Sequence, residues 1–285
     1  MTRSLLFCLV LTLLIASCSR VPLTGRKQVK LLPESELVQM SLAAYNDFLQ
    51  SNNVVQNTSQ SEMVQRIGDG LAGSVEGILS NEGFSDRIDL LQWDFNLVQD
   101  DLINAWAMPG GKVVIYTGIL PVTESETGLA VVMGHELAHA IALHGNERMS
   151  QAMLAQMGLA TLDIAAMNQP EETRQLLMLA AGIGTEVGVL LPFSRKQESE
   201  ADELGLIFMA NAGYDPREAV RFWERMDQHT GSASVPQFLS THPSHETRIS
   251  DLQNKYLPTA LTYYNQSQNS SNRSSGGSGK KGYSR

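Results

Sequence analysis

One apolar stretch of the chain, MGHELAHAIALHG at residues 133–145, contains three histidines and one glutamate. His135 and His139 are four residues apart, so on a helix they share one face, with Cβ atoms about 5–6 Å apart. That spacing lets one imidazole nitrogen of each reach a single zinc ion at about 2.0–2.1 Å. Glu136 lies next to the first histidine, where its carboxylate can take a proton from an attacking water and pass it to a leaving amine. The pattern HExxH therefore predicts one zinc ion per chain, with His135 and His139 as ligands and Glu136 as the catalytic base.

A catalytic zinc site also needs a third protein ligand and an open fourth position. His144 is one residue short of the third ligand in the pattern HExxHxxGxxH, and Ala142 stands where that pattern has glycine. We therefore expect His144 to lie near the C-terminus of the helix, where an imidazole interacts favourably with the helix dipole, and not on the metal. The alternative for His135 and His139 is that they are satisfied polar residues of a core helix.

A carboxylate from a later segment, SRKQESEAD at residues 194–202, is the other source of a third ligand. Glu198 and Asp202 are four residues apart and share a helix face. Glu198 could bind the metal, and Asp202 could accept the second N–H of a liganding histidine and so fix its tautomer. Glu200 projects from another face and is expected to be in solvent. Without HExxH, a charged helix surface would be the preferred interpretation of all three acids.

The first 18 residues, MTRSLLFCLVLTLLIASC, predict export. Arg3 precedes an apolar run over residues 5–15, which is too short to span a membrane and is typical of a signal peptide. The run ends in Ile-Ala-Ser-Cys, which resembles the bacterial lipobox, so we predict a lipoprotein-type signal peptide over residues 1–17 and lipidation of Cys18. Ser19 resembles an outer-membrane sorting signal. The alternative is a plain secretory signal followed by an incidental cysteine.

The elements that must position these side chains are predicted mainly from apolar periodicity. Helical spacing of apolar residues predicts helices over residues 33–50, 61–80, 147–168 and 195–211. Alternation of apolar and polar residues predicts a strand near residues 90–98. A run of β-branched residues after a Pro-Gly-Gly turn predicts a second strand over residues 112–117.

Local signals also bound the helix that carries the histidines. Thr123 and Glu126 have the spacing of a capping box, which predicts that this helix begins after Thr123, and Gly145 is its expected end. In the following helix Met149, Met153 and Met157 step by four residues and are expected to face the core. Residues 175–193 are apolar with three glycines, and are expected to form either a buried helix or a mobile flap over the site.

The chain as a whole predicts one catalytic domain. We predict a tether over residues 18–33, which are polar with two prolines, the domain over residues 34–262, and a disordered tail over residues 263–285, which turn to Ser, Asn, Gly and Lys. The net charge of −9 argues against a nucleic-acid partner.

Six segments of the chain resemble the gluzincin metallopeptidase family of the HtpX heat-shock protease and the CAAX prenyl protease, and in particular its periplasmic branch of BepA- and LoiP-type lipoproteins. They are GRKQ at 25–28, NAWAMPGG at 104–111, GHELAHAIALHG at 134–145, SRKQESEADELG at 194–205, NAGYDP at 211–216 and THPSHETRI at 241–249. These segments follow the family order and span most of residues 25–253.

The resemblance implies a mostly helical α+β fold of the zincin type. In that fold an HExxH helix faces a second helix that carries the glutamate ligand, which implies Glu198 as the third zinc ligand and Asp202 as its supporting aspartate. A small β-sheet has an edge strand that aligns an extended substrate, which falls on Asn104, Ala105, Trp106 and Ala107. The membrane spans of the HtpX branch and the helical repeats that follow the BepA catalytic domain are not matched. We therefore do not expect cleavage inside a bilayer or a partner-docking module.

Two residues of the last segment keep open interpretations. His242, followed by proline, could simply lie in a turn before a helix that starts near Ser244. Alternatively, it could fill the open position on zinc in a resting state. Arg248 is expected to position a carboxylate near the metal or to contact the substrate and transition state.

Together these features predict a zinc-dependent metalloendopeptidase of the bacterial cell envelope. We expect it in the periplasm, held by a lipid on Cys18 to the outer membrane. Its implied substrates are misfolded or unassembled envelope proteins, whose peptide bonds it would hydrolyse in protein quality control. The alternative is a non-catalytic chaperone or assembly factor with a structural or capped zinc site, and a weaker alternative is a lipoprotein scaffold without metal.

Overall fold

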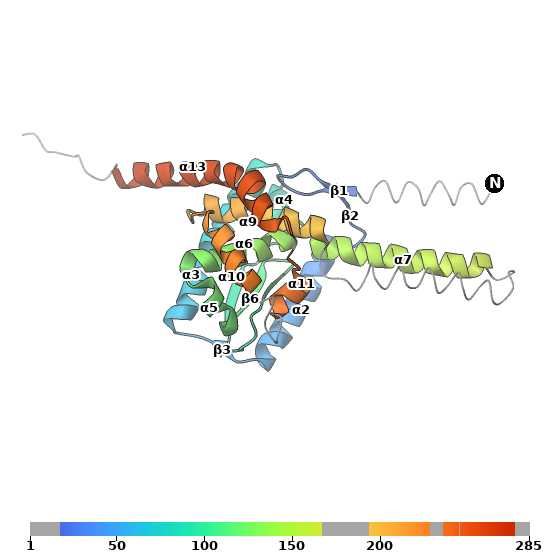
Figure 1. The fold of residues 1–285 in the computed structure, drawn as a ribbon. Coiled ribbons are helices and arrows are strands. Elements are labelled where there is room, and N and C mark those ends of the chain that lie inside the picture. Colours follow the sequence, from blue (N-terminus) through green and yellow to red (C-terminus); the bar gives the residue numbers. More distant parts are fainter. Residues whose placement is uncertain (1–17, 167–193, 229–235, 245, 277–285) are drawn as a thin grey trace, which may run out of the picture.

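The computed structural model describes residues 18–166, 194–228, 236–244 and 246–276. Helices surround a four-stranded sheet with the order β3-β4-β6-β5 (Figure 1). Its strands are β3 (Val54–Val55), β4 (Asp94–Val98), β5 (Ala105–Met108) and β6 (Lys112–Tyr116). β4 and β6 are parallel, whereas β3 and β5 run antiparallel to their neighbours and form the two edges. The predicted mostly helical α+β fold with a small sheet is confirmed.

The predicted helices are found with small shifts at their ends. The structure has α2 (Glu34–Ser51), α3 (Ser59–Asn81), α4 (Ser85–Ile88), a 3-10 turn (Thr117–Ile119), α5 (Leu120–Thr123), α6 (Glu126–Ile141), α7 (His144–Ala166), α9 (Arg195–Asn211), α10 (Glu218–Gln228), α11 (Gln237–Thr241), α12 (Arg248–Asp251), a π-helical turn (Leu252–Tyr256) and α13 (Leu257–Gly276). α7 and α13 extend from the body in opposite directions (Figure 1).

Two glycines let α6 and α9 approach closely at the centre of the core. A Cβ on Gly205 would lie 2.9 Å from the carbonyl carbon of Gly134, so any side chain there would push the helices apart. Around this contact the two helices bury apolar residues such as Leu129, Met133 and Phe208. The close approach matters for chemistry because α6 carries the HExxH residues and α9 carries the acids of the later segment.

Both ends of α6 differ from the prediction. The cap is Ser125, whose hydroxyl accepts a hydrogen bond from the amide of Gly128 at 3.0 Å. Thr123 belongs to α5 and donates to the carbonyl of Leu120, so it is not available as a cap. α6 ends at Ile141 because Leu143 takes a left-handed conformation, with φ of 56°. Gly145 therefore lies inside α7 and does not end α6.

The predicted tether over residues 18–33 is wrong, because this segment folds onto the domain. β1 (Cys18–Arg20) and β2 (Lys27–Val29) form an antiparallel hairpin in which Val21 is buried. After the hairpin, the amide of Leu31 donates to the hydroxyl of Ser150, and Asn146 donates to the carbonyl of Leu32. Both of these partners belong to α7, which holds the segment in place.

The predicted disordered tail is also corrected, because α13 continues through residue 263 to Gly276. Ala260 is buried, and Tyr263 and Tyr264 pack against the core. Further along, Ser267 donates to the carbonyl of Ala210, and Gln268 donates to the carbonyl of Gly213 at the end of α9. These contacts stabilise a polar helix that its composition alone does not favour. Residues 277–285 lie outside the described residues.

The methionines of α7 are exposed, which contradicts the prediction that they face the core. Met149, Met153 and Met157 have exposed fractions of 39%, 41% and 61%. The reason is that α7 leaves the body of the domain after its first turns (Figure 1). The predicted signal peptide and the predicted helix or flap at 175–193 lie outside the described residues.

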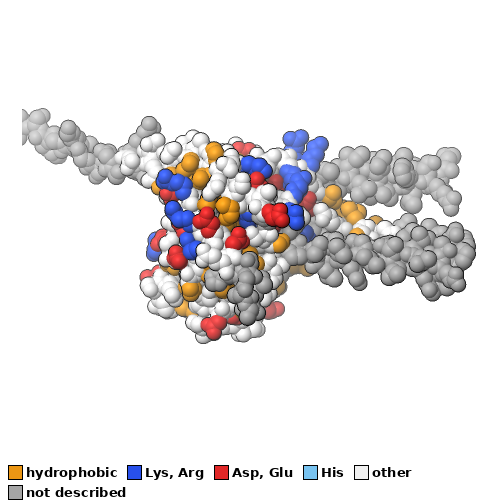
Figure 2. Space-filling model, viewed as in Figure 1, with side chains coloured by type: hydrophobic (Ala, Val, Ile, Leu, Met, Phe, Trp, Pro, Cys, Tyr) orange, Lys and Arg blue, Asp and Glu red, His pale blue; other side chains and the backbone are white. Residues whose placement is uncertain are grey.

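The surface and the helices give two further observations. None of the helices in the described part of the chain combines the length and the apolar composition that crossing a bilayer requires. Basic and acidic side chains are interspersed over the face of the body shown in Figure 2.

Candidate metal centre

Four buried side chains from three parts of the fold converge on one point. His135 and His139 come from α6, Glu198 from α9, and His242 follows α11; one ligand atom of each lies within 4.8 Å of all the others. The Nε2 atoms of His135 and His139 are 3.1 Å apart, and Glu198 Oε1 lies 3.3 Å from His139 Nε2. Donor atoms arranged as a tetrahedron about 2.0–2.1 Å from zinc are about 3.3–3.4 Å apart. The donor spacing and chemistry therefore fit one zinc ion.

The local sequence explains how Glu198 reaches the histidines. Ser194 caps α9 and forms a capping box with Gln197, in which each side chain bonds to the backbone amide of the other residue. Glu198 follows in the first turn and points towards α6, which the glycine contact keeps close. Glu198 is surrounded by imidazoles, because its Oε1 also lies 3.0 Å from His242 Nδ1.

Charge inside the cluster is set by these contacts. Burial lowers the pKa of His135, but Asp202 and Glu198 outweigh it and raise the pKa to about 9. Burial raises the pKa of Glu198, yet hydrogen bonds from the histidines outweigh it and hold that pKa well below its usual range. A metal ligand must be a neutral imidazole, so metal binding here would release a proton.

Glu136 occupies the position expected of a general base. Its carboxylate is buried, and its Oε1 lies 3.2 Å from Nε2 of His242. The carboxylate also has a hydrogen bond to the backbone of Ala107 in β5. Burial raises the pKa of Glu136, which brings a carboxylate closer to the range in which it can both accept and return a proton.

His135 is held from behind by a carboxylate and an arginine. Its Nδ1 lies 3.0 Å from Asp202 Oδ1, the contact expected of that aspartate. Arg248 donates to the same oxygen at 2.7 Å, and its guanidinium carbon lies 3.2 Å from the centroid of the Trp223 ring. Arg248 is only 1% exposed, and its contact with Asp202 agrees with the predicted positioning of a carboxylate. The other predicted role, a contact with the substrate and transition state, stays a prediction.

The structure corrects the expected positions of His144 and Glu200. His144 begins α7, and its Nδ1 lies 2.8 Å from Nδ1 of His139, on the side away from the cluster. Its Nε2 lies 2.9 Å from Glu200 Oε2. Glu200 is 6% exposed, so the expectation that it is in solvent is wrong. The face of α9 that carries Glu200 is covered by the N-terminal hairpin, which the sequence periodicity of α9 does not reveal.

The predicted substrate strand is an edge of the sheet. β5 pairs with β6 on one side, and Asn104, just before it, accepts a hydrogen bond from the amide of Tyr116. Ala105 is buried in the core, whereas Trp106 makes an edge contact with Phe48 of α2, with ring centroids 4.9 Å apart. Since the side chains of the strand are engaged in packing, its backbone is the part that an extended peptide could pair with.

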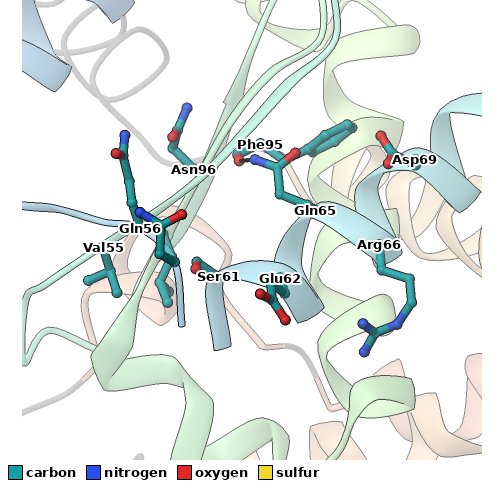
Figure 3. A pocket seen from close by; sticks show the side chains of 11 residues that line it. Val55, Gln56, Ser61, Glu62, Gln65, Arg66, Asp69, Phe95 and Asn96 are labelled. Carbon is teal, nitrogen blue, oxygen red and sulfur yellow. Dashed lines mark hydrogen bonds between the residues drawn. The ribbon is translucent and has the colours of Figure 1, made fainter. Parts of the chain in front are cut away.

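A separate pocket lies at the opposite edge of the sheet (Figure 3). It is lined by β3, by β4 and by the first turns of α3, where Gln65 donates to the carbonyl of Phe95. Its lining contains none of the four converging residues. We therefore assign the chemistry to the cluster and not to this pocket.

Comparison with known proteins gives a family match over most of the described domain. The family model described as peptidase family M48 matches residues 60–256. The mitochondrial metalloendopeptidase OMA1 of Schizosaccharomyces pombe is 38% identical over 64% of this chain and 51% of its own length. The human metalloendopeptidase OMA1 is 29% identical over 84% of this chain and 46% of its own length.

A bacterial relative is also found. The beta-barrel assembly-enhancing protease of Escherichia coli is 32% identical over 56% of this chain and 34% of its own length. The chain thus spans about half the length of the two OMA1 relatives, and a smaller part of the bacterial protease. All four converging residues lie within the matched range 60–256.

Proposed function

The chain belongs to peptidase family M48, and on that premise we propose that it is a zinc-dependent metalloendopeptidase. The observation that carries the proposal is the buried carboxylate of Glu136 between the histidine and glutamate cluster and the edge strand β5. A structural zinc site has no need of an additional carboxylate at this position. The presence of Glu136 therefore favours an enzyme over a chaperone with a structural or capped zinc site.

The residues divide the reaction among them. His135, His139 and Glu198 would hold zinc, which when bound would polarise the scissile carbonyl and lower the pKa of a bound water. The backbone of β5 aligns an extended segment of the substrate by β-pairing. Glu136 takes a proton from the attacking water and returns it to the leaving amine.

The proposed location and substrates come from the N-terminal sequence and from the name of one relative. Residues 1–17 have the character of a signal peptide, and lipidation of Cys18 would hold the protein at the outer membrane, facing the periplasm. Cys18 begins the folded hairpin, so such an anchor would sit directly against the domain. The name of the beta-barrel assembly-enhancing protease refers to β-barrel assembly, which favours unassembled envelope proteins as substrates; misfolded envelope proteins remain part of the same proposal. The OMA1 relatives are mitochondrial by name, so the bacterial location rests on the leader sequence.

Metal removal tests the activity. We expect the full-length chain to contain one zinc ion by mass spectrometry and to cleave an unfolded protein, to lose cleavage in a chelator, and to regain it with added zinc. Zinc without cleavage would favour the chaperone alternative. A protein that contains no zinc and binds none on addition would contradict the assignment of His135, His139 and Glu198 as ligands.

His242 is the proposed fourth ligand of a resting state. Its Nδ1 lies 3.0 Å from Glu198 Oε1, and its Nε2 lies 3.2 Å from Glu136 Oε1. One imidazole thus contacts both an expected zinc ligand and the general base. With His242 in this place Glu136 is not free to take a proton, and His242 must move away before cleavage. The open form, in which His242 has left the cluster, is then expected to be less populated than the resting form.

Substitution of His242 by alanine is expected to increase peptidase activity, by roughly tenfold if the open form is about 10% populated. Zinc content should stay at one per chain, because three ligands remain. Thr241→Ala is the matched control, since Thr241 adjoins His242 and its hydroxyl donates to a nearby carbonyl, that of Phe238. Unchanged or lower activity of His242→Ala, with zinc retained, would contradict the resting-state role.

A further inference from the structure

The turn of the N-terminal hairpin contacts two buried carboxylates, Glu147 of α7 and Glu200 of α9. Arg26 donates through Nη1 and Nη2 to the two oxygens of Glu147 at 2.7 and 2.9 Å, and through Nε to Glu200 Oε2 at 2.6 Å. Thr24 donates to the other oxygen of Glu200 at 2.5 Å. The side chains of Arg26, Glu147 and Glu200 are 13%, 8% and 6% exposed. The hairpin therefore holds both carboxylates in a largely water-free place.

From Glu200 the contacts continue to the metal centre. Glu200 Oε2 lies 2.9 Å from His144 Nε2, and His144 Nδ1 lies 2.8 Å from His139 Nδ1. The other nitrogen of His139 faces His135 and Glu198 within the cluster. An unbroken series of hydrogen-bonding groups thus runs from the hairpin to one of the proposed zinc ligands.

The direction of each hydrogen bond follows from a count of donors and acceptors. A carboxylate only accepts, so His144 must carry its proton on Nε2. The Nδ1 of neutral His144 is then an acceptor, and the proton of the short contact between the two imidazoles must belong to Nδ1 of His139. The lone pair of His139 is then on Nε2, the nitrogen that faces His135 and Glu198 and would bind zinc. The carboxylate of Glu200 therefore selects the tautomer of His139 that can bind a metal.

We propose that Arg26 is a positioning residue of the metal centre, which acts on His139 through Glu200 and His144. The proposal rests on the proposed function in one respect, namely that His139 is a zinc ligand. Each histidine of HExxH then has a carboxylate and an arginine behind it: Asp202 and Arg248 directly for His135, and Glu200 and Arg26 through His144 for His139. The difference is that the support of His139 comes from the N-terminal hairpin.

The geometry requires arginine rather than a cation of any shape. Arg26 holds Glu147 with its two terminal nitrogens and Glu200 with its Nε, so one planar group sets the position of both carboxylates. A lysine would supply the charge but not the fork. Gln197, in the capping box of α9, donates to Glu147 at 2.9 Å, which ties the same cluster to the helix that carries Glu198.

Zinc affinity, measured by competition with a chelator on the full-length chain, tests the proposal. Loss of a group that supports a ligand typically weakens metal affinity by about 10–100-fold. We expect a weakening in this range for Arg26→Gln and a smaller one for Arg26→Lys. Arg225→Gln is the matched control, because Arg225 is also mostly buried and is paired with a glutamate, Glu218, at 2.8 Å. Arg225 also donates to the carbonyl of Val122, and neither of these partners belongs to the metal centre. It should leave zinc affinity unchanged.

A double-mutant cycle separates positioning from a general loss of structure. His144→Phe removes the acceptor of His139 but keeps a ring in its place, and should itself weaken zinc binding. In that background Arg26→Gln should weaken zinc binding no further, because its route to His139 is already cut. Additive losses, or wild-type zinc affinity of folded Arg26→Gln, would overturn the proposal. If Arg26→Gln does not fold, the same cycle is measured with Arg26→Lys, under the same two criteria.

The two proposals fail in different ways. If the wild-type chain binds no zinc, the proposed function and this inference fall together. If the wild type binds zinc and cleaves protein while the Arg26 variants bind zinc as tightly, the inference alone is overturned.

Discussion

Substitution of Glu136 by glutamine is expected to lower the rate of peptide cleavage by about 10²–10⁴-fold, the usual contribution of a general acid–base group. Glutamine has nearly the same shape and keeps a hydrogen-bond acceptor for the backbone of Ala107, but it cannot take a proton from water. Because Glu136 is not among the expected zinc ligands, the variant should still bind one zinc ion. The loss should therefore appear in kcat with little change in zinc content.

The measurement compares cleavage of an unfolded protein, zinc content and thermal stability for the wild type and the variant. Glu126→Gln is the matched control: the same substitution in the first turn of the same helix, where Glu126 makes a partly exposed ion pair with Arg66 at 2.7 Å. The control should retain activity. Appreciable cleavage by zinc-loaded Glu136→Gln would rule out Glu136 as the base.

Replacement of Arg248 by methionine is expected to destabilise the protein by about 3–5 kcal/mol, the usual cost of removing one partner from a buried ion pair. Arg248 is 1% exposed and lies 2.7 Å from Asp202 and 3.4 Å from Glu198. Methionine can occupy the space over Trp223, but it removes one of the cations that face two buried carboxylates, Asp202 and Glu198. Asp202 would also lose the contact that directs it towards His135.

Urea unfolding of the zinc-free proteins measures this cost without a contribution from metal binding. Arg217→Met is the control, since Arg217 pairs with Asp215 at 2.7 Å with its own side chain 57% exposed, and exposed pairs contribute little. We expect no measurable change for the control. A destabilisation by Arg248→Met as small as that of the control would mean that the buried cation is not needed to compensate Asp202 and Glu198.

The helices that carry the chemistry could be predicted because their signals are local. The spacing of His135 and His139 requires only a helix, and the same holds for Glu198 and Asp202. The ends of α6 were harder, because Thr123 and Ser125 are both suitable caps, and the choice depends on where α5 ends. Composition was a poor guide to α13, whose polar turns are held by carbonyls of another helix.

Burial of single polar residues was not predictable from the helix that carries them. Glu200 lies on a face of α9 that would be in solvent if α9 were packed only on α6, and the hairpin around Arg26 covers it from more than 170 residues away. The methionines of α7 show the reverse case, in which an apolar stripe extends beyond the body that would have covered it.

The sequence by itself determined which donors could bind a metal, where the general base stands relative to them, and which helices carry them, since helical periodicity places residues four apart on one face. Asp202 could be expected behind a liganding histidine, but only the tertiary structure decided what stands behind His139. The contacts of His139 with His144, of His144 with Glu200 and of Glu200 with Arg26 join separate elements, and hydrogen bonds select a tautomer only where those elements meet.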